Sequence, residues 1–86
     1  ERESTLKAHR FRGGLAYAIR IDANTEKVIA AFVSHGNLTT GALVEFTGLS
    51  RPTVTKRLDR LYAAEYVEYL HEPTALWRLT ADPRAA

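Results

Sequence analysis

The chain has 86 residues, 45% of them hydrophobic and 26% charged, which fits one compact domain with a modest core and does not fit a disordered chain. No cysteine is present, which excludes a disulfide scaffold and any thiolate metal site and agrees with a cytoplasmic protein. The formal net charge is +2, too small to indicate a nucleic-acid partner by itself, and no apolar run approaches the roughly 20 residues that a membrane-spanning helix needs.

Residues 1–23 are expected to form an N-terminal extension. The chain starts without Met and without a signal-peptide pattern, so we expect a processed chain or a fragment of a longer protein. Residues 4–9 could form a short helix, which the sequence RGG at 12–14 would end. In residues 15–21 large apolar side chains alternate with Ala and Arg, which favours a strand, although the alanines also permit a helix. We expect the extension to pack beside the core or to form a dimer contact.

The first clear helix is expected to begin near Asp22. Either Asp22 or Asn24 can cap it, because both side chains can accept a hydrogen bond from the free N–H groups of a first turn. From Val28 to about Ser34 apolar residues recur at helical spacing, and Gly36 suits the left-handed conformation that ends many helices. The pattern predicts an amphipathic helix with one buried face.

Two further helices follow, separated by a tight turn that contains a glycine. Either Thr39 or Thr40 can cap the second helix. Ser50 is suited to cap the third, and Pro52 falls in its first turn, where a missing N–H costs nothing. We expect the third helix to run to about Ala64. Two helices joined in this way form a helix-turn-helix, whose second helix can enter the major groove of DNA.

A β-hairpin is predicted after the third helix. Residues 66–70, YVEYL, are rich in the aromatic and branched side chains that are typical of strands. Residues 71–74 form a turn, and residues 76–79, LWRL, form the returning strand. The tail from residue 81 is expected to be loose. The sequence therefore predicts an α+β fold over residues 24–80, with a three-helix core and a C-terminal hairpin.

The positive charge gathers in two segments of the chain. Residues 1–20 carry five basic residues against two Glu, and residues 48–64 carry four against one Asp. A localised block of this kind is what a phosphate backbone selects. In the third helix Val54, Leu58 and Leu61 share one face, so the opposite face would turn basic and hydroxyl side chains outward.

These outward and flanking side chains are the candidate DNA contacts. Arginine can read guanine through two parallel hydrogen bonds, which makes Arg51 and Arg57 candidates for base reading. Threonine can bond to bases or phosphates, and a late basic residue such as Arg60 is better placed for phosphates. On the third helix and its cap the candidate contacts are Ser50, Arg51, Thr53, Thr55, Lys56, Arg57 and Arg60. Thr39 and Thr40, at the start of the second helix, are candidates as well.

The sequence LTTGALVEFTGLSRPTVTKRLDRLYAAEYVEYLHEPTALWRLT resembles the winged-helix module of prokaryotic regulators of the MarR, ArsR and IclR type. The stretch TGLSRPTVTKRLDRL matches most closely, since such regulators carry Ser/Thr-rich and Arg-rich recognition helices with this Val/Leu spacing. The resemblance implies a winged helix-turn-helix, sequence-specific binding of double-stranded DNA in transcription regulation, and usually a homodimer. It implies base contacts by Ser50, Arg51, Thr53, Thr55 and Lys56.

Two departures from the family pattern concern the end of the recognition helix and the wing. Many relatives carry Gly just after this helix, where the present chain has Ala64, Glu65 and Tyr66. Many also carry Gly and Arg at the wing tip, where this chain has HEPTA. Because Glu72 would repel phosphate, we expect weak wing contacts through His71 or Thr74, or none.

Other classes of function have less support. Winged helices also serve as protein-interaction modules in replication, partition or transcription complexes, and the acidic wing tip mildly favours this alternative. The three histidines are far apart and none has ligand spacing, so no metal site and no cofactor is predicted. No motif indicates a nucleophile with its base, so an enzyme is the least supported class. The residues identify no small-molecule effector.

Overall fold

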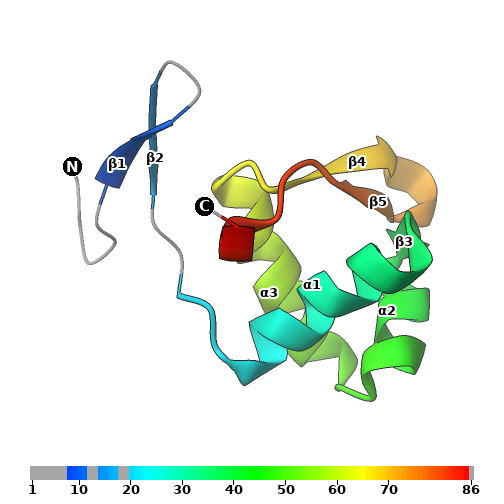
Figure 1. The fold of residues 1–86 in the computed structure, drawn as a ribbon. Helices are drawn as coiled ribbons and strands as arrows, with labels where there is room; N and C mark the ends of the chain where they lie inside the picture. The colour runs from blue at the N-terminus through cyan, green and yellow to red at the C-terminus, as the bar shows by residue number, and fades with distance from the viewer. Residues whose placement is uncertain (1–7, 12–13, 18–19, 86) are drawn as a thin grey trace.

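The computed structural model describes residues 8–11, 14–17 and 20–85. These residues form three α-helices and a small three-stranded sheet, with a two-stranded hairpin to one side of that body (Figure 1). No helix in the described ranges is long and apolar enough to cross a membrane.

The N-terminal hairpin consists of β1 (Ala8–Phe11) and β2 (Gly14–Tyr17), which pair in antiparallel fashion. The strand expected over residues 15–21 is confirmed as far as Tyr17 and is wrong at residues 20–21, which form no strand. Residues 18–19 lie outside the described part of the chain. The short helix considered for residues 4–9 is wrong at its C-terminal end, because its last two residues belong to β1. Its first four residues lie outside the described ranges.

The first helix, α1 (Ala23–His35), lies where the hydrophobic spacing predicted it. Asp22 caps it, and one carboxylate oxygen, Oδ1, accepts hydrogen bonds from the backbone N–H of Thr25 at 2.8 Å and from its hydroxyl at 2.7 Å. Gly36 ends the helix with φ 86°, a backbone angle that favours glycine, and donates its N–H to the carbonyl of Phe32.

The second helix, α2 (Thr40–Thr47), is capped by Thr39. The Thr39 hydroxyl oxygen accepts a hydrogen bond from the backbone N–H of Ala42 at 3.0 Å, which decides between the two candidate threonines. Gly48 follows in the left-handed conformation at φ 72°, and its N–H donates to the carbonyl of Val44. This conformation lets the chain turn sharply into the next helix.

The third helix, α3 (Arg51–Ala63), has the predicted cap and ends one residue earlier than expected. The Ser50 hydroxyl oxygen accepts the N–H of Thr53, and proline stands in the first turn. After the helix Glu65 adopts φ 68°. This is the left-handed region, which favours glycine. The glycine that the family pattern has near this point would therefore suit the backbone conformation observed at Glu65.

The sheet has the strand order β3–β5–β4, and all its pairs are antiparallel. The predicted hairpin is confirmed as β4 (Val67–His71) and β5 (Leu76–Leu79), joined by a 3₁₀ turn at Glu72–Thr74 and by Ala75 at φ 51°. The added strand β3 (Leu38–Thr39) was not expected. β3 has only two residues, the second of which is the cap of α2, and this length is too short to show the period of a strand.

The core lies between the three helices and the inner face of the sheet. Its largest members are all less than a tenth exposed: Val28, Ile29, Phe32, Leu38, Leu43, Val54, Leu58, Leu61, Tyr66, Val67 and Trp77. The inward face predicted for α3 is therefore confirmed. The tail that was expected to be loose forms a 3₁₀ turn at Pro83–Ala85, in which Arg84 pairs with Asp82 at 2.8 Å.

Candidate nucleic-acid interface

The outward face of α3 carries most of the candidate contacts. Its buried face is anchored in the core, so the opposite side and its edges meet solvent. Arg51, Lys56 and Arg60 are exposed, and among the described residues none of these three forms an ion pair. Thr55 is also exposed. These four side chains can reach a ligand without first breaking a contact to another described charged group.

The hydroxyl groups at the starts of α2 and α3 already have structural partners. The Ser50 hydroxyl donates to the hydroxyl oxygen of Thr53 at 2.8 Å and accepts the N–H of the same residue. Thr39 accepts the helix N–H described above. Because a hydroxyl group has two acceptor sites and one donor, Ser50 can still accept one hydrogen bond, and Thr39 can still donate one and accept one.

Thr40 does not lie at this surface. The residue is 8% exposed, and its hydroxyl oxygen accepts the indole N–H of Trp77 at 3.0 Å. Its backbone N–H donates to the carbonyl of Ala75 at 3.1 Å. The pairing of β3 with β5 draws Thr40 beneath the sheet, so this residue belongs to the core and leaves the set of candidate contacts.

Arg57 is also held inside the domain. Its Nη2 donates to Oδ2 of Asp22 at 2.8 Å and its Nε to Oδ1 at 3.4 Å, and the two side chains are 14% and 26% exposed. The hydroxyl and the N–H of Thr25, together with Arg57, hold the pKa of Asp22 well below its usual range, against the opposing effect of burial. The bidentate pair joins the start of α1 to the middle of α3. We therefore remove Arg57 from the candidate contacts.

The wing, residues 67–79, carries one Arg against two Glu. The Nδ1 of His71 lies 2.9 Å from the hydroxyl oxygen of Thr74, and both side chains are exposed at the tip beside Glu72. On the strands Arg78 pairs with Glu68 across the β4–β5 ladder. The wing thus presents two side chains that can bond to a ligand and no unpaired Arg or Lys among its described residues.

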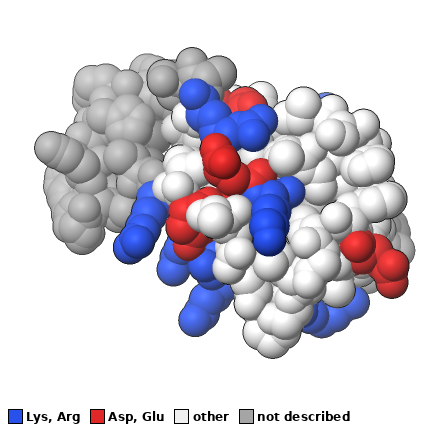
Figure 2. Space-filling model, turned by 60° about the horizontal axis from the view of Figure 1, so that its bottom comes forward, with Lys and Arg blue, Asp and Glu red and all other residues white. Residues whose placement is uncertain are grey.

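Among the described residues, the positive side chains do not form one unbroken patch on the face shown in Figure 2. Figure 2 shows Lys and Arg groups at several places on the face that lies at the bottom of Figure 1, with Asp and Glu groups between them. A small net charge agrees with this mixture. Any binding to nucleic acid at this surface would therefore depend on a few well-placed cations and not on a broad positive field.

Two tyrosines, one on α3 and one on β4, lie partly exposed beside the candidate contacts. Tyr62 is 51% exposed and Tyr69 on β4 is 37% exposed, with ring centroids 5.7 Å apart. Both rings pack against Trp77, at 5.8 Å and 3.9 Å between centroids. Tyr62 follows Thr55 by seven residues, two helical turns, so both lie on one side of α3. That spacing was the sequence signal that could have identified Tyr62 as an exposed neighbour of the candidate contacts.

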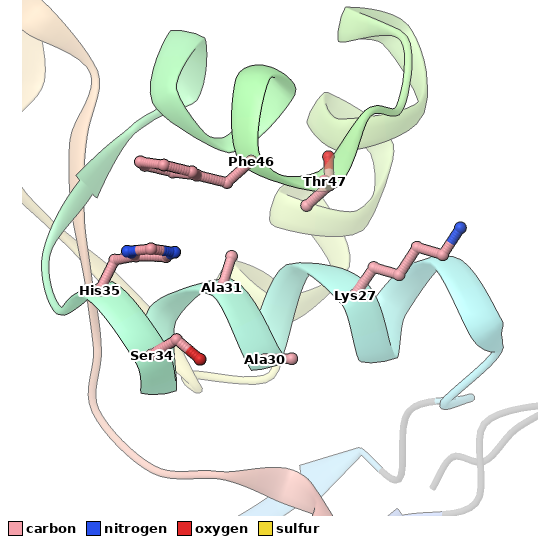
Figure 3. Close-up of a pocket in the computed structure, with 7 residues that line it drawn as sticks. All are labelled: Lys27, Ala30, Ala31, Ser34, His35, Phe46 and Thr47. Carbon is pink, nitrogen blue, oxygen red and sulfur yellow. The ribbon is translucent and has the colours of Figure 1, made fainter.

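A shallow hollow of about 370 Å³ lies between α1 and α2 (Figure 3). One end is formed by His35 and Phe46, whose rings stack at 3.9 Å with an interplanar angle of 11°. The residues that line the hollow include none of the candidate DNA contacts. Among the described residues, no group of three or more His, Asp or Glu side chains is arranged to hold a metal ion.

Comparison with known proteins identifies the family. A family model described as MarR family matches residues 26–75, more than half of the chain, from the first turn of α1 to the turn between the wing strands. No curated protein and no solved structure gives a significant match. Three helices and a three-stranded antiparallel sheet, with β3 between α1 and α2 and the hairpin β4–β5 after α3, confirm the winged helix that the sequence resemblance implied. The chain therefore belongs to the MarR family, whose members are winged-helix, DNA-binding transcription regulators.

Proposed function

We propose that this chain recognises a specific sequence in double-stranded DNA, with α3 in the major groove, and regulates transcription in the cytoplasm. One observation carries the proposal. A capped helix of 13 residues has its apolar face in the core, while Arg51, Lys56 and Arg60 stand exposed and unpaired among the described residues. An α-helix with its side chains is about 10–12 Å wide, close to the width of the major groove.

The proposed contacts divide into two kinds. Side chains in the first turns of a recognition helix reach base edges, so Arg51 and Thr55 are proposed to read bases, with Arg51 suited to guanine. Arg60, about two and a half turns after Arg51, is proposed to bind phosphate. The full proposed set is Thr39, Ser50, Arg51, Thr53, Thr55, Lys56 and Arg60, with His71 and Thr74 as weaker contacts from the wing.

We infer that the protein acts as a homodimer. Two chains related by a two-fold axis would place their α3 helices about 34 Å apart, on half-sites one helical turn apart. We propose that the N-terminal hairpin takes part in this contact. A two-stranded hairpin alone is marginally stable in water, and pairing with a further strand would make it more stable. The expected target is therefore a palindrome or near-palindrome.

Selection of bound sequences from a random duplex pool tests the proposal. We expect enrichment of two related half-sites with a constant spacing. A pool that yields no enriched sequence, together with no binding to random duplex at low salt, would reject DNA recognition by this chain. That outcome would favour the alternative of a protein-interaction module.

A further inference from the structure

Four basic residues lie on α3, and they are not equivalent. Arg51, Lys56 and Arg60 are exposed without an ion pair among the described residues, whereas Arg57 is held by two hydrogen bonds to Asp22. One quarter of the positive charge of the proposed recognition helix is therefore neutralised by a residue from outside the helix-turn-helix.

We propose that Asp22 withholds Arg57 from the DNA backbone and thereby limits the part of the affinity that is independent of sequence. This inference rests on the proposed function. The Asp22 carboxylate is held in position independently of Arg57, because it accepts hydrogen bonds from the N–H and the hydroxyl of Thr25. Thr25 itself is 2% exposed, so the acceptor of the guanidinium is anchored to the core. An aspartate carboxylate is charged at neutral pH, and the hydrogen bonds from Thr25 and Arg57 lower the pKa of Asp22 further.

The position of Arg57 on α3 explains what its release would do. At about 100° per residue, Arg57 lies beside the buried stripe of Val54, Leu58 and Leu61 and not at the centre of the outward face. A helix that fills the major groove brings its flanks close to the sugar–phosphate walls. A long guanidinium side chain on such a flank contacts phosphate when no carboxylate holds it.

The size of the effect follows from counterion release. Each cation that neutralises a phosphate steepens the slope of log affinity against log salt by about 0.9. One additional contact per chain therefore raises affinity about eight-fold at 0.1 M salt. Because phosphate contacts carry no sequence information, this increase applies to every duplex.

The variant Asp22→Asn separates the charge from the cap, because asparagine caps helices about as well as aspartate. Binding of the full chain to a random-sequence duplex is measured by fluorescence anisotropy over a range of salt concentrations. We expect Asp22→Asn to bind about eight-fold more tightly at 0.1 M salt for each chain that contacts the duplex, or roughly 60-fold for a dimer, with a slope about 0.9 steeper per chain. Asp22→Ser, which also caps and carries no charge, should behave in the same way. Circular dichroism at the assay temperature verifies that each variant is folded.

Two further variants complete the test. Glu26→Gln makes the same change in net charge at an exposed position of the same helix, and should raise affinity much less. Arg57→Gln alone should leave the wild-type slope unchanged, and combined with Asp22→Asn it should abolish the gain. Equal gains for Asp22→Asn and Glu26→Gln, or a flatter slope for Arg57→Gln alone, would overturn the inference while DNA binding by the wild type stands. A wild type that binds no duplex at low salt would refute the proposed function and this inference together.

Discussion

Asp22 combines two structural roles in one carboxylate, and substitutions can remove them separately. It caps α1 through Thr25, and it holds Arg57 of α3 by a bidentate ion pair that is largely shielded from solvent. Alanine removes both roles. Asparagine keeps a capping oxygen and removes only the charge.

The magnitudes follow from these contacts. Loss of a helix cap costs about 1 kcal/mol, and loss of a hydrogen bond to a charged group costs about 1.5 to 3 kcal/mol. With Arg57 at 14% exposure and without its partner, Asp22→Ala should lower the free energy of unfolding by about 3 kcal/mol. Asp22→Asn should lower it by about 2 kcal/mol. For a domain of this size the alanine variant should melt about 12 to 24 °C below the wild type.

Urea denaturation followed by circular dichroism measures these differences, and a double-mutant cycle with Arg57→Met isolates the ion pair. We expect a coupling energy of about 1 to 2 kcal/mol, above the range of exposed surface pairs because the pair is shielded. If Asn and Ala destabilise the domain equally, the capping role is wrong. If the coupling energy is close to zero, Arg57 does not depend on Asp22 and the link between α1 and α3 is wrong.

Three further predictions use other features of the structure. The folded-state pKa of Asp22 is lowered, so its stabilising effect is present above the unfolded pKa of about 3.9 and is lost as the pH falls below that value. When the free energy of unfolding is measured as the pH is lowered, it should fall less for Asp22→Asn than for the wild type. Arg51→Ala should reduce the ratio of cognate to scrambled affinity, whereas Arg60→Ala should weaken both alike, as measured by anisotropy; equal losses for Arg51→Ala on both duplexes would contradict base reading. Ala75→Gly should raise the free energy of unfolding by about 1 kcal/mol in urea titrations, because Ala75 occupies the left-handed region at φ 51°; an unchanged midpoint would show that no strain is relieved there.

The sequence alone determined the features whose signals are local. Ser50 and Pro52 mark the start of α3 because capping and the first turn depend on a few neighbouring atoms. The spacing of Val54, Leu58 and Leu61 defines the inner face of the same helix, since it depends only on the helical period. The wing strands and the resemblance to a regulator family could also be predicted, because each depends on a short run of neighbouring residues.

Only the tertiary structure decided which candidate contacts remain available. From the sequence, Thr39 and Thr40 are equally good candidates for the cap of α2. In the structure β3 pairs with β5, and the Thr40 hydroxyl oxygen accepts a buried hydrogen bond from Trp77. Asp22 and Arg57 are 35 residues apart, and no local pattern joins them. Chain segments that are distant in sequence meet only when the core packs, so the accessibility and the charge of a surface side chain depend on contacts that no sequence window contains.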